Sequence, residues 1–377
     1  TSIYELLEDR KVAALFFIVS DMAGSGVKFF VVCTVLQKFV FDDLGVPFLL
    51  TVPLMVACIW LYTRRGGVRT LVYTDVIQTT LMLAALVGII ASIDTPLGGN
   101  YGSYFSVFEF DDWVSTQNFW KQFVSGAFIV VFMTGLNQNM MQKNLTCKTL
   151  RDAQKDMCLS GFLFLPVNFL FLLFGVMLIG WTGQNGIPLP EKGDDLLPLF
   201  VTTEATFTVK VLFVLGIVSA AFSSADSSLT ALTTSYCVDI AEKPGDERLR
   251  KRMHIVMSLV FVGVIYALQY SGSKSLIDLV YVLVSYTYGP LLGMFAYFMV
   301  SRRKTRKENK EIEGNTVSSY SLLPCLLAPV ICYLLNTWTT SAFGYKFGYE
   351  LLLINGLLAF LGLQTLKIFT KRAIFNN

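Results

Sequence analysis

The segment from Ser219 to Ile240 places many Ser and Thr side chains and the carboxylate of Asp226 inside an apolar run that begins near Val209. A membrane-spanning helix rarely tolerates so much polarity unless the polar face meets other helices, water or an ion. Hydroxyl, carbonyl and carboxylate oxygens are hard ligands, which suit an alkali cation better than a transition metal. This segment therefore predicts a cation-binding helix in a membrane protein.

The spacing of the serines supports this interpretation. Ser223 and Ser227 lie four residues apart, as do Ser224 and Ser228, so each pair shares a helix face. Ala220 comes one turn before Ser223, and its small side chain leaves the backbone carbonyl accessible to a ligand. The alternative is structural: Ser and Thr can bond back to helix carbonyls and let helices pack closely.

Two further carboxylates fall inside predicted spans. Asp21 lies two turns before Lys28 on the same helix face, which suggests a mutual or interhelical salt bridge or, alternatively, a role for Lys28 in binding an anionic solute. Asp75 and Asp226 have no cation nearby in the sequence, which leaves a bound cation or a proton as counter-charge. A catalytic carboxylate pair is not supported by any nucleophile, metal motif or phosphate loop. The sequence therefore does not indicate an enzyme.

The composition is that of a polytopic membrane protein. Apolar residues make up 54% of the 377 residues, charged residues only 15%, and mean hydropathy is +0.58. Long hydrophobic runs recur along the chain, so we expect an all-α fold in a single transmembrane domain, residues 1–377. The ten predicted spans are 12–40, 45–63, 69–93, 119–142, 156–183, 207–237, 252–271, 275–300, 319–338 and 347–369.

The charges of the connecting loops alternate along the chain. Lys and Arg concentrate in loops 64–69, 143–155, 242–252 and 302–310. The remaining loops contain few basic residues. By the positive-inside rule the basic loops and both termini face the cytoplasm of a cell membrane. The basic tract 301–318 adjoins a span and is expected to contact lipid headgroups of the bilayer, not nucleic acid.

Two sites along the chain favour interrupted helices. The stretch GLNQNMMQKNLTCKTLRDAQKD, residues 135–156, combines a glycine with several amides near a helix end, which suits backbone unwinding or capping. Gly289 and Pro290 lie inside the span 275–300, where they permit a kink or hinge. At the first site ordinary packing is the default interpretation, and at the second an ordinary kink without a gating role is the alternative.

Four collinear motifs together resemble the sodium/solute symporter family, whose members carry sugars, proline, sialic acid, monocarboxylates or iodide. They are TSIYELLEDR, GGVRTLVYTDVIQ, GLNQNMMQKNLTCKTLRDAQK and the Ser-rich helix ending in VDI. The resemblance implies a LeuT-type fold of inverted five-helix repeats, with the ion and solute sites near the bilayer midplane. It also implies Na⁺ as the coupling ion.

The resemblance implies two sodium sites on the Ser-rich helix. Residues matching the family's main site are the Ala220 carbonyl, Ser223 and Ser224. Asp75 matches an aspartate that members place near the sodium path. A second site, one turn deeper, would use Asp226 and Ser227, facing Asp75. We expect this second site to exist.

The solute site is less defined. Candidate positions are Lys28, Val130, Met133 and Tyr286. Sodium/galactose members carry Asn and Tyr where this chain has Val130 and Met133, so a sugar pocket of that type is not expected. The family's first three helices have no counterpart in the sequence. One of them supplies two carbonyls to the main sodium site, so we expect part of the site to lie outside these residues.

The function implied is sodium-coupled symport of a small polar or anionic solute by alternating access. Two alternatives remain: a solute-sensing module with the same fold, and a non-functional fragment of a symporter. The sequence does not identify the solute, the sodium stoichiometry or the oligomeric state.

Overall fold

The computed structural model describes residues 2–7, 9–93, 109–115, 118–190, 193–269, 276–307 and 321–375. Within these ranges the chain is helical, apart from turns and one isolated β-bridge between Glu109 and Asn118. The α-helices are α1 (Arg10–Leu36), α2 (Phe48–Ser92), α3 (Phe119–Gly135), α4 (Gln138–Asn144), α5 (Leu150–Gln184), α6 (Leu196–Thr203), α7 (Phe207–Ser235), α8 (Glu247–Gln269), α9 (Leu276–Thr287), α10 (Gly289–Lys307), α11 (Leu322–Phe343) and α12 (Leu351–Phe375). Short helical turns add η1 (Ile3–Leu6), η2 (Gln37–Phe41), η4 (Gly193–Asp195) and η5 (Tyr236–Ile240).

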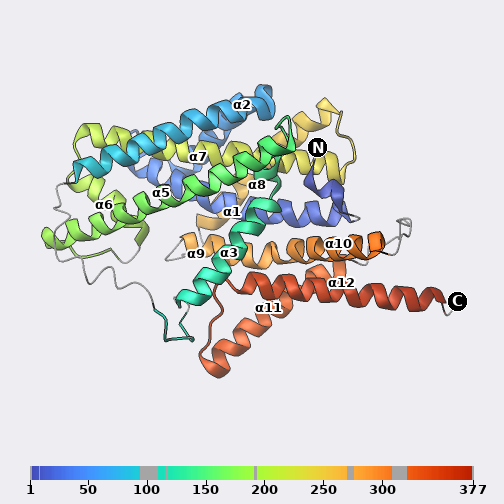
Figure 1. The fold of residues 1–377 in the computed structure, drawn as a ribbon. Helices are drawn as coiled ribbons and strands as arrows, with labels where there is room; N and C mark the ends of the chain where they lie inside the picture. The colour runs from blue at the N-terminus through green and yellow to red at the C-terminus, as the bar shows by residue number, and fades with distance from the viewer. Residues whose placement is uncertain are drawn as a thin grey trace.

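Helix α7 lies at the centre of the packing. It contacts α1, α2 and α8, and it runs beside α2 over much of its length (Figure 1). The α2–α7 contact is close because small residues meet there: a Cβ added to Gly216 would lie 2.8 Å from Cβ of Ala85. Helices α10, α11 and α12 form a second group on the opposite side of α1 (Figure 1). The Ser-rich helix is therefore enclosed on several sides, as its polar face requires.

The apolar segments agree with the ten predicted spans. Six described helical segments are long and apolar enough to cross a membrane: Arg10–Phe41, Val72–Ser92, Leu150–Gln184, Phe207–Ile240, Glu247–Gln269 and Leu322–Phe343. Four shorter apolar segments complete the set: Phe48–Leu61, Phe119–Phe132, Gly289–Ser301 and Leu351–Lys367. Each predicted span overlaps one of these segments. The chain is thus a multi-pass helical membrane protein.

One predicted loop is wrong. The basic stretch 64–69 was expected to connect two spans, but the backbone is helical throughout, and α2 continues over 45 residues. Such a helix is about 68 Å long, more than twice the thickness of a bilayer's hydrocarbon core. The stretch contains no proline, and its two glycines weaken a helix by only about 1 kcal/mol each without preventing it.

Both predicted helix interruptions are present. The span predicted at 119–142 divides into α3 and α4, with Leu136 and Asn137 between them. The span predicted at 275–300 divides into α9 and α10 at Tyr288. The two breaks lie together, because the Asn137 side chain donates a hydrogen bond of 2.9 Å to the hydroxyl of Tyr288. These breaks supply polar groups to the interior of the helix bundle.

Candidate functional site

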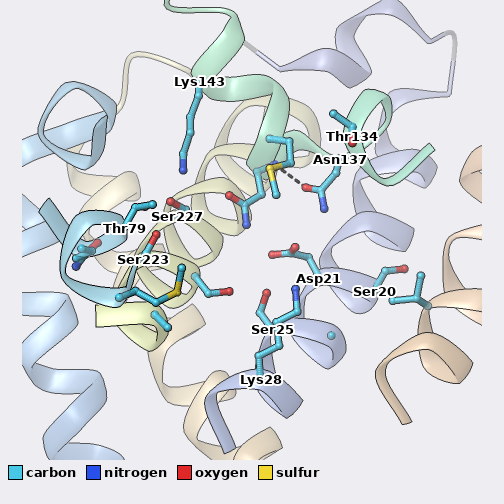
Figure 2. A pocket seen from close by; sticks show the side chains of 18 of the residues that line it. Ser20, Asp21, Ser25, Lys28, Thr79, Thr134, Asn137, Lys143, Ser223 and Ser227 are labelled. Carbon is cyan, nitrogen blue, oxygen red and sulfur yellow. Dashed lines mark hydrogen bonds between the residues drawn. The ribbon is translucent and has the colours of Figure 1, made fainter. Parts of the chain in front are cut away.

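A polar cavity of about 320 Å³ lies where α1, α2, α7 and the two helix breaks meet (Figure 2). Its α7 wall is formed by residues one turn apart: Ser219, Ala220, Ser223, Ser224 and Ser227. The face predicted from the serine spacing is therefore the face that borders the cavity. The implied main sodium-site residues (Ala220, Ser223 and Ser224) lie on one wall.

Asp75 of α2 does not itself line the cavity but contacts two residues that do, Ser223 and Lys143. Ser223 donates a short hydrogen bond to one of its carboxylate oxygens, and Lys143 of α4 forms an ion pair with the other. The sequence had left a bound cation or a proton as the counter-charge of Asp75. That expectation is corrected here, because the counter-charge is the Lys143 ammonium, which the chain brings from 68 residues away. Sequence reasoning missed Lys143, although it lies within the amide-rich motif.

Asp21 faces the cavity from α1. Its carboxylate accepts a short hydrogen bond from Ser228 of α7, and the side chains of Asn137 and Asn139 also hydrogen-bond to it. Lys28 lines the same cavity (Figure 2), but among the described residues no ion pair joins it to Asp21. The predicted mutual salt bridge is therefore absent from this arrangement. Seven residues of helix separate the two positions by about 10.5 Å along the axis.

The residues predicted for a second sodium site take different positions. Ser227 lines the cavity, and its backbone carbonyl accepts a hydrogen bond of 3.1 Å from Gln142. Asp226 is fully buried and does not line the cavity. The structure thus places Ser227 on the wall of the cavity beside Ser223, with Asp226 behind that wall.

Several buried oxygens of α2, α4 and α7 lack a hydrogen-bond partner within the described part of the chain. They are the hydroxyl oxygen of Ser227 and the amide oxygens of Gln78 and Gln142. Leaving a buried acceptor unsatisfied costs about 1–3 kcal/mol, so such atoms point to a missing water or cation. Hydroxyl and amide oxygens are suitable ligands for a hard cation such as Na⁺. The residues present at this wall therefore fit the ion that the resemblance implies.

The helix break between α3 and α4 is held by side chains from distant segments. The Tyr4 hydroxyl donates to the carbonyl of Leu136 at 2.9 Å, and the Gln138 amide oxygen accepts from the backbone of Ile3 at 2.9 Å. Asn137 caps α4 by accepting from the backbone of Asn139. The freed backbone groups are thus satisfied within the protein, which membrane-depth interruptions require.

The break between α9 and α10 depends on α12. Asn355, which is fully buried, donates to the carbonyls of Ser285 and Tyr286 at 3.0 and 2.8 Å. Gly289 makes this approach feasible, since an added Cβ would lie 2.3 Å from the Asn355 side chain. The break turns Tyr288 into the cavity, and sequence reasoning had not selected this residue.

Two of the predicted solute positions, Val130 and Tyr286, do not line the cavity, and a third, Met133, cannot be placed. Val130 is 54% exposed on the outside of α3, and the side chain of Met133 lies outside the described part of the structure. Tyr286 packs near Tyr333, with 6.5 Å between ring centroids, and does not line the cavity. Of the three candidates whose side chains the structure describes, only Lys28 lines the cavity.

Comparison with known proteins gives consistent matches. A model of the sodium:solute symporter family matches residues 10–307. The sodium/sialic acid symporter SiaT of Proteus mirabilis (strain HI4320) is 24% identical over 324 residues, which cover 78% of this chain and 64% of SiaT. The human sodium/iodide cotransporter is 27% identical over 278 residues, covering 68% of this chain and 42% of that protein. The chain therefore spans less than two thirds of the length of these relatives.

A solved structure confirms the predicted fold. The substrate-bound outward-open state of a Na⁺-coupled sialic acid symporter superposes with a TM-score of 0.74. The match covers 96% of this chain and 75% of that one, at 18% sequence identity. At this identity the likeness concerns the arrangement of helices alone.

Proposed function

Because the chain belongs to the sodium:solute symporter family, we propose that it forms the transport unit, or most of it, of a sodium-coupled secondary symporter. The transporter imports a small polar or anionic organic solute by alternating access, driven by the inward sodium gradient. No covalent intermediate is needed. The basic stretches that do connect helices, within 143–155 and 242–252, face the cytoplasm of the cell membrane.

The observation that carries this proposal is the position of the implied main sodium-site residues. Ala220, Ser223 and Ser224 line one wall of a polar cavity that is otherwise surrounded by apolar helices. Placing this many hydroxyls at a cavity inside a membrane protein is costly unless they have a ligand or water to bind. The hydroxyl and carbonyl oxygens of this wall supply the ligand type that Na⁺ requires.

Each part of the site then has a separate role. The oxygens of α7 hold the ion, and Asp75 with Ser227 provides oxygens for a second ion one turn deeper. The helix breaks at Asn137 and Tyr288 provide the points at which α4 and α10 can change angle relative to α3 and α9. Sodium binding favours the conformation in which the solute side of the cavity is open, which is a population shift.

The proposal is tested by ²²Na⁺ uptake into proteoliposomes containing the purified protein. We expect sodium uptake that does not occur when potassium takes the place of sodium. Sodium uptake should be at least tenfold lower in the Ser223→Ala/Ser224→Ala double variant. Lys251→Gln, which changes an exposed residue at a helix end, serves as the control and should transport normally. Equal uptake in the double variant and the unaltered protein contradicts the proposal.

A further inference from the structure

Among the charged groups at the cavity, Asp75 and Lys143 form an ion pair, whereas Asp21 and Lys28 do not. Asp21, Lys28 and Lys143 line the cavity, and Lys143 is neutralised by Asp75. This leaves Asp21 and Lys28 as opposite charges that face one space; they interact electrostatically but form no contact ion pair with each other. Within the described residues, Lys28 forms no ion pair with any other carboxylate. A charge in such a site requires a counter-charge or water.

The two groups differ in how firmly they are held. Asp21 is 5% exposed, and its carboxylate is fixed by hydrogen bonds from Ser228, Asn137 and Asn139. Lys28 is exposed toward the cavity at the end of a flexible four-carbon stem (Figure 2). The cavity therefore offers a fixed negative site and an adjustable positive site on one helix, about two turns apart.

A solute with one charge satisfies only half of this arrangement. A simple carboxylate placed at Lys28 would bring a second negative charge into the same small cavity as Asp21, where like charges repel. A simple amine would meet the corresponding repulsion at Lys28. A solute that carries both charges neutralises both groups and adds no net charge beyond that of the sodium ion proposed at the α7 wall.

We infer that the cavity binds a small zwitterionic solute, with its carboxylate at Lys28 and its ammonium group at Asp21. This inference rests on the proposed symport function and narrows its solute class. The cavity volume of about 320 Å³ is at the lower end of the range for small-molecule sites. A solute of amino-acid size fits this volume, and the adjustable reach of Lys28 sets the distance between its two charges.

The inference is tested by the melting temperature of the purified protein in sodium, because a ligand stabilises the state it binds. The zwitterions are alanine, 4-aminobutanoate and 6-aminohexanoate, which separate the two charges progressively. Each is compared with its single-charge analogues of the same carbon chain: propanoate, butanoate and hexanoate, and the corresponding alkylamines. We expect at least one zwitterion to bind tenfold or more tightly than both of its analogues. This comparison uses the unaltered protein and so does not depend on the folding of a variant.

Variants then assign the two ends of the solute. Asp21→Asn should weaken zwitterion binding about 30-fold, the usual effect of removing one partner of a buried charge pair, and should abolish the preference over the matched carboxylate. Lys28→Gln should abolish the preference over the matched amine. Lys251→Gln, remote from the cavity, is the control and should retain both preferences.

The failure of this inference is distinguishable from the failure of symport. If in all three series a single-charge analogue binds as tightly as its zwitterion, or if no zwitterion raises the melting temperature, the inference is overturned. Sodium-dependent stabilisation in the same samples would still support symport. Conversely, zwitterion binding that is equal in sodium and potassium supports the inference and contradicts sodium coupling.

Discussion

The ion pair between Asp75 and Lys143 leads to a prediction about sodium affinity. The Lys143 ammonium occupies the carboxylate to which Ser223 also donates, so a sodium ion that binds Asp75 must compete with it. Replacing Lys143 by Met removes the ammonium and keeps most of the side-chain volume. The variant should therefore bind sodium more tightly, although it loses an ion pair.

The size of the effect follows from the burial of the pair. The side chain of Lys143 is 29% exposed and that of Asp75 is 17% exposed. The pair is therefore intermediate between a fully exposed and a fully buried ion pair. Exposed pairs contribute about 0–1 kcal/mol, whereas breaking a buried pair costs about 3–5 kcal/mol. An intermediate value of about 2 kcal/mol corresponds to a roughly 30-fold change in sodium affinity.

The assay is a sodium titration of the melting temperature, with potassium holding the ionic strength constant. We expect the midpoint sodium concentration to fall about 30-fold in Lys143→Met and to change little in Lys143→Arg, which keeps the charge. Adding Ser223→Ala to Lys143→Met should reverse the gain. A midpoint that is unchanged or higher in Lys143→Met would refute the competition between the ammonium and the ion.

Three other predictions concern the helix break between α9 and α10, the cytoplasmic surface of the protein, and the orientation of the chain in the membrane. Asn355→Leu removes both donors to the carbonyls freed between α9 and α10 and should lower the free energy of unfolding by about 2–4 kcal/mol, measured by denaturant titration. Arg10 and Lys11 lower the pKa of Glu242 by hydrogen bonding and charge. The stability difference between the unaltered protein and Glu242→Gln should thus be present at neutral pH and be lost as pH falls through the lowered pKa of Glu242, where its carboxylate becomes protonated; a difference that persists in stronger acid would contradict this. Cys147, a half-buried free thiol in the turn between α4 and α5, should react with an impermeant maleimide only from the cytoplasmic side in a variant that retains it as the sole cysteine.

Local patterns were enough to predict much of the fold. The four-residue spacing of the serines identified the cavity-facing side of α7, since helix geometry alone determines which side chains share a face. Gly289 and the amide-rich stretch after Gly135 marked both helix breaks, because glycine and capping side chains are what an interrupted helix needs. At residues 64–69 the charge pattern indicated a loop, but charge does not by itself end a helix.

The site could be predicted only in part, because its charge pairing is a tertiary property. Asp21 meets Ser228 across 207 residues, and Asp75 meets Lys143 across 68. Neither partner follows from spacing along one helix. Asp21 and Lys28 share a face, yet their separation along the helix leaves them unpaired. The turn of Tyr288 into the cavity likewise depends on Asn355 from α12.

The central claim is that a sodium ion binds at the Ser-rich face of α7. The most direct measurement compares the melting temperature of the purified protein in sodium and in potassium at equal ionic strength, alongside Ser223→Ala/Ser224→Ala. We expect stabilisation by sodium that the double variant loses, because the hydroxyls that hold the ion are gone. Sodium stabilisation of equal size in the double variant, or equal melting temperatures in the two salts, would contradict it.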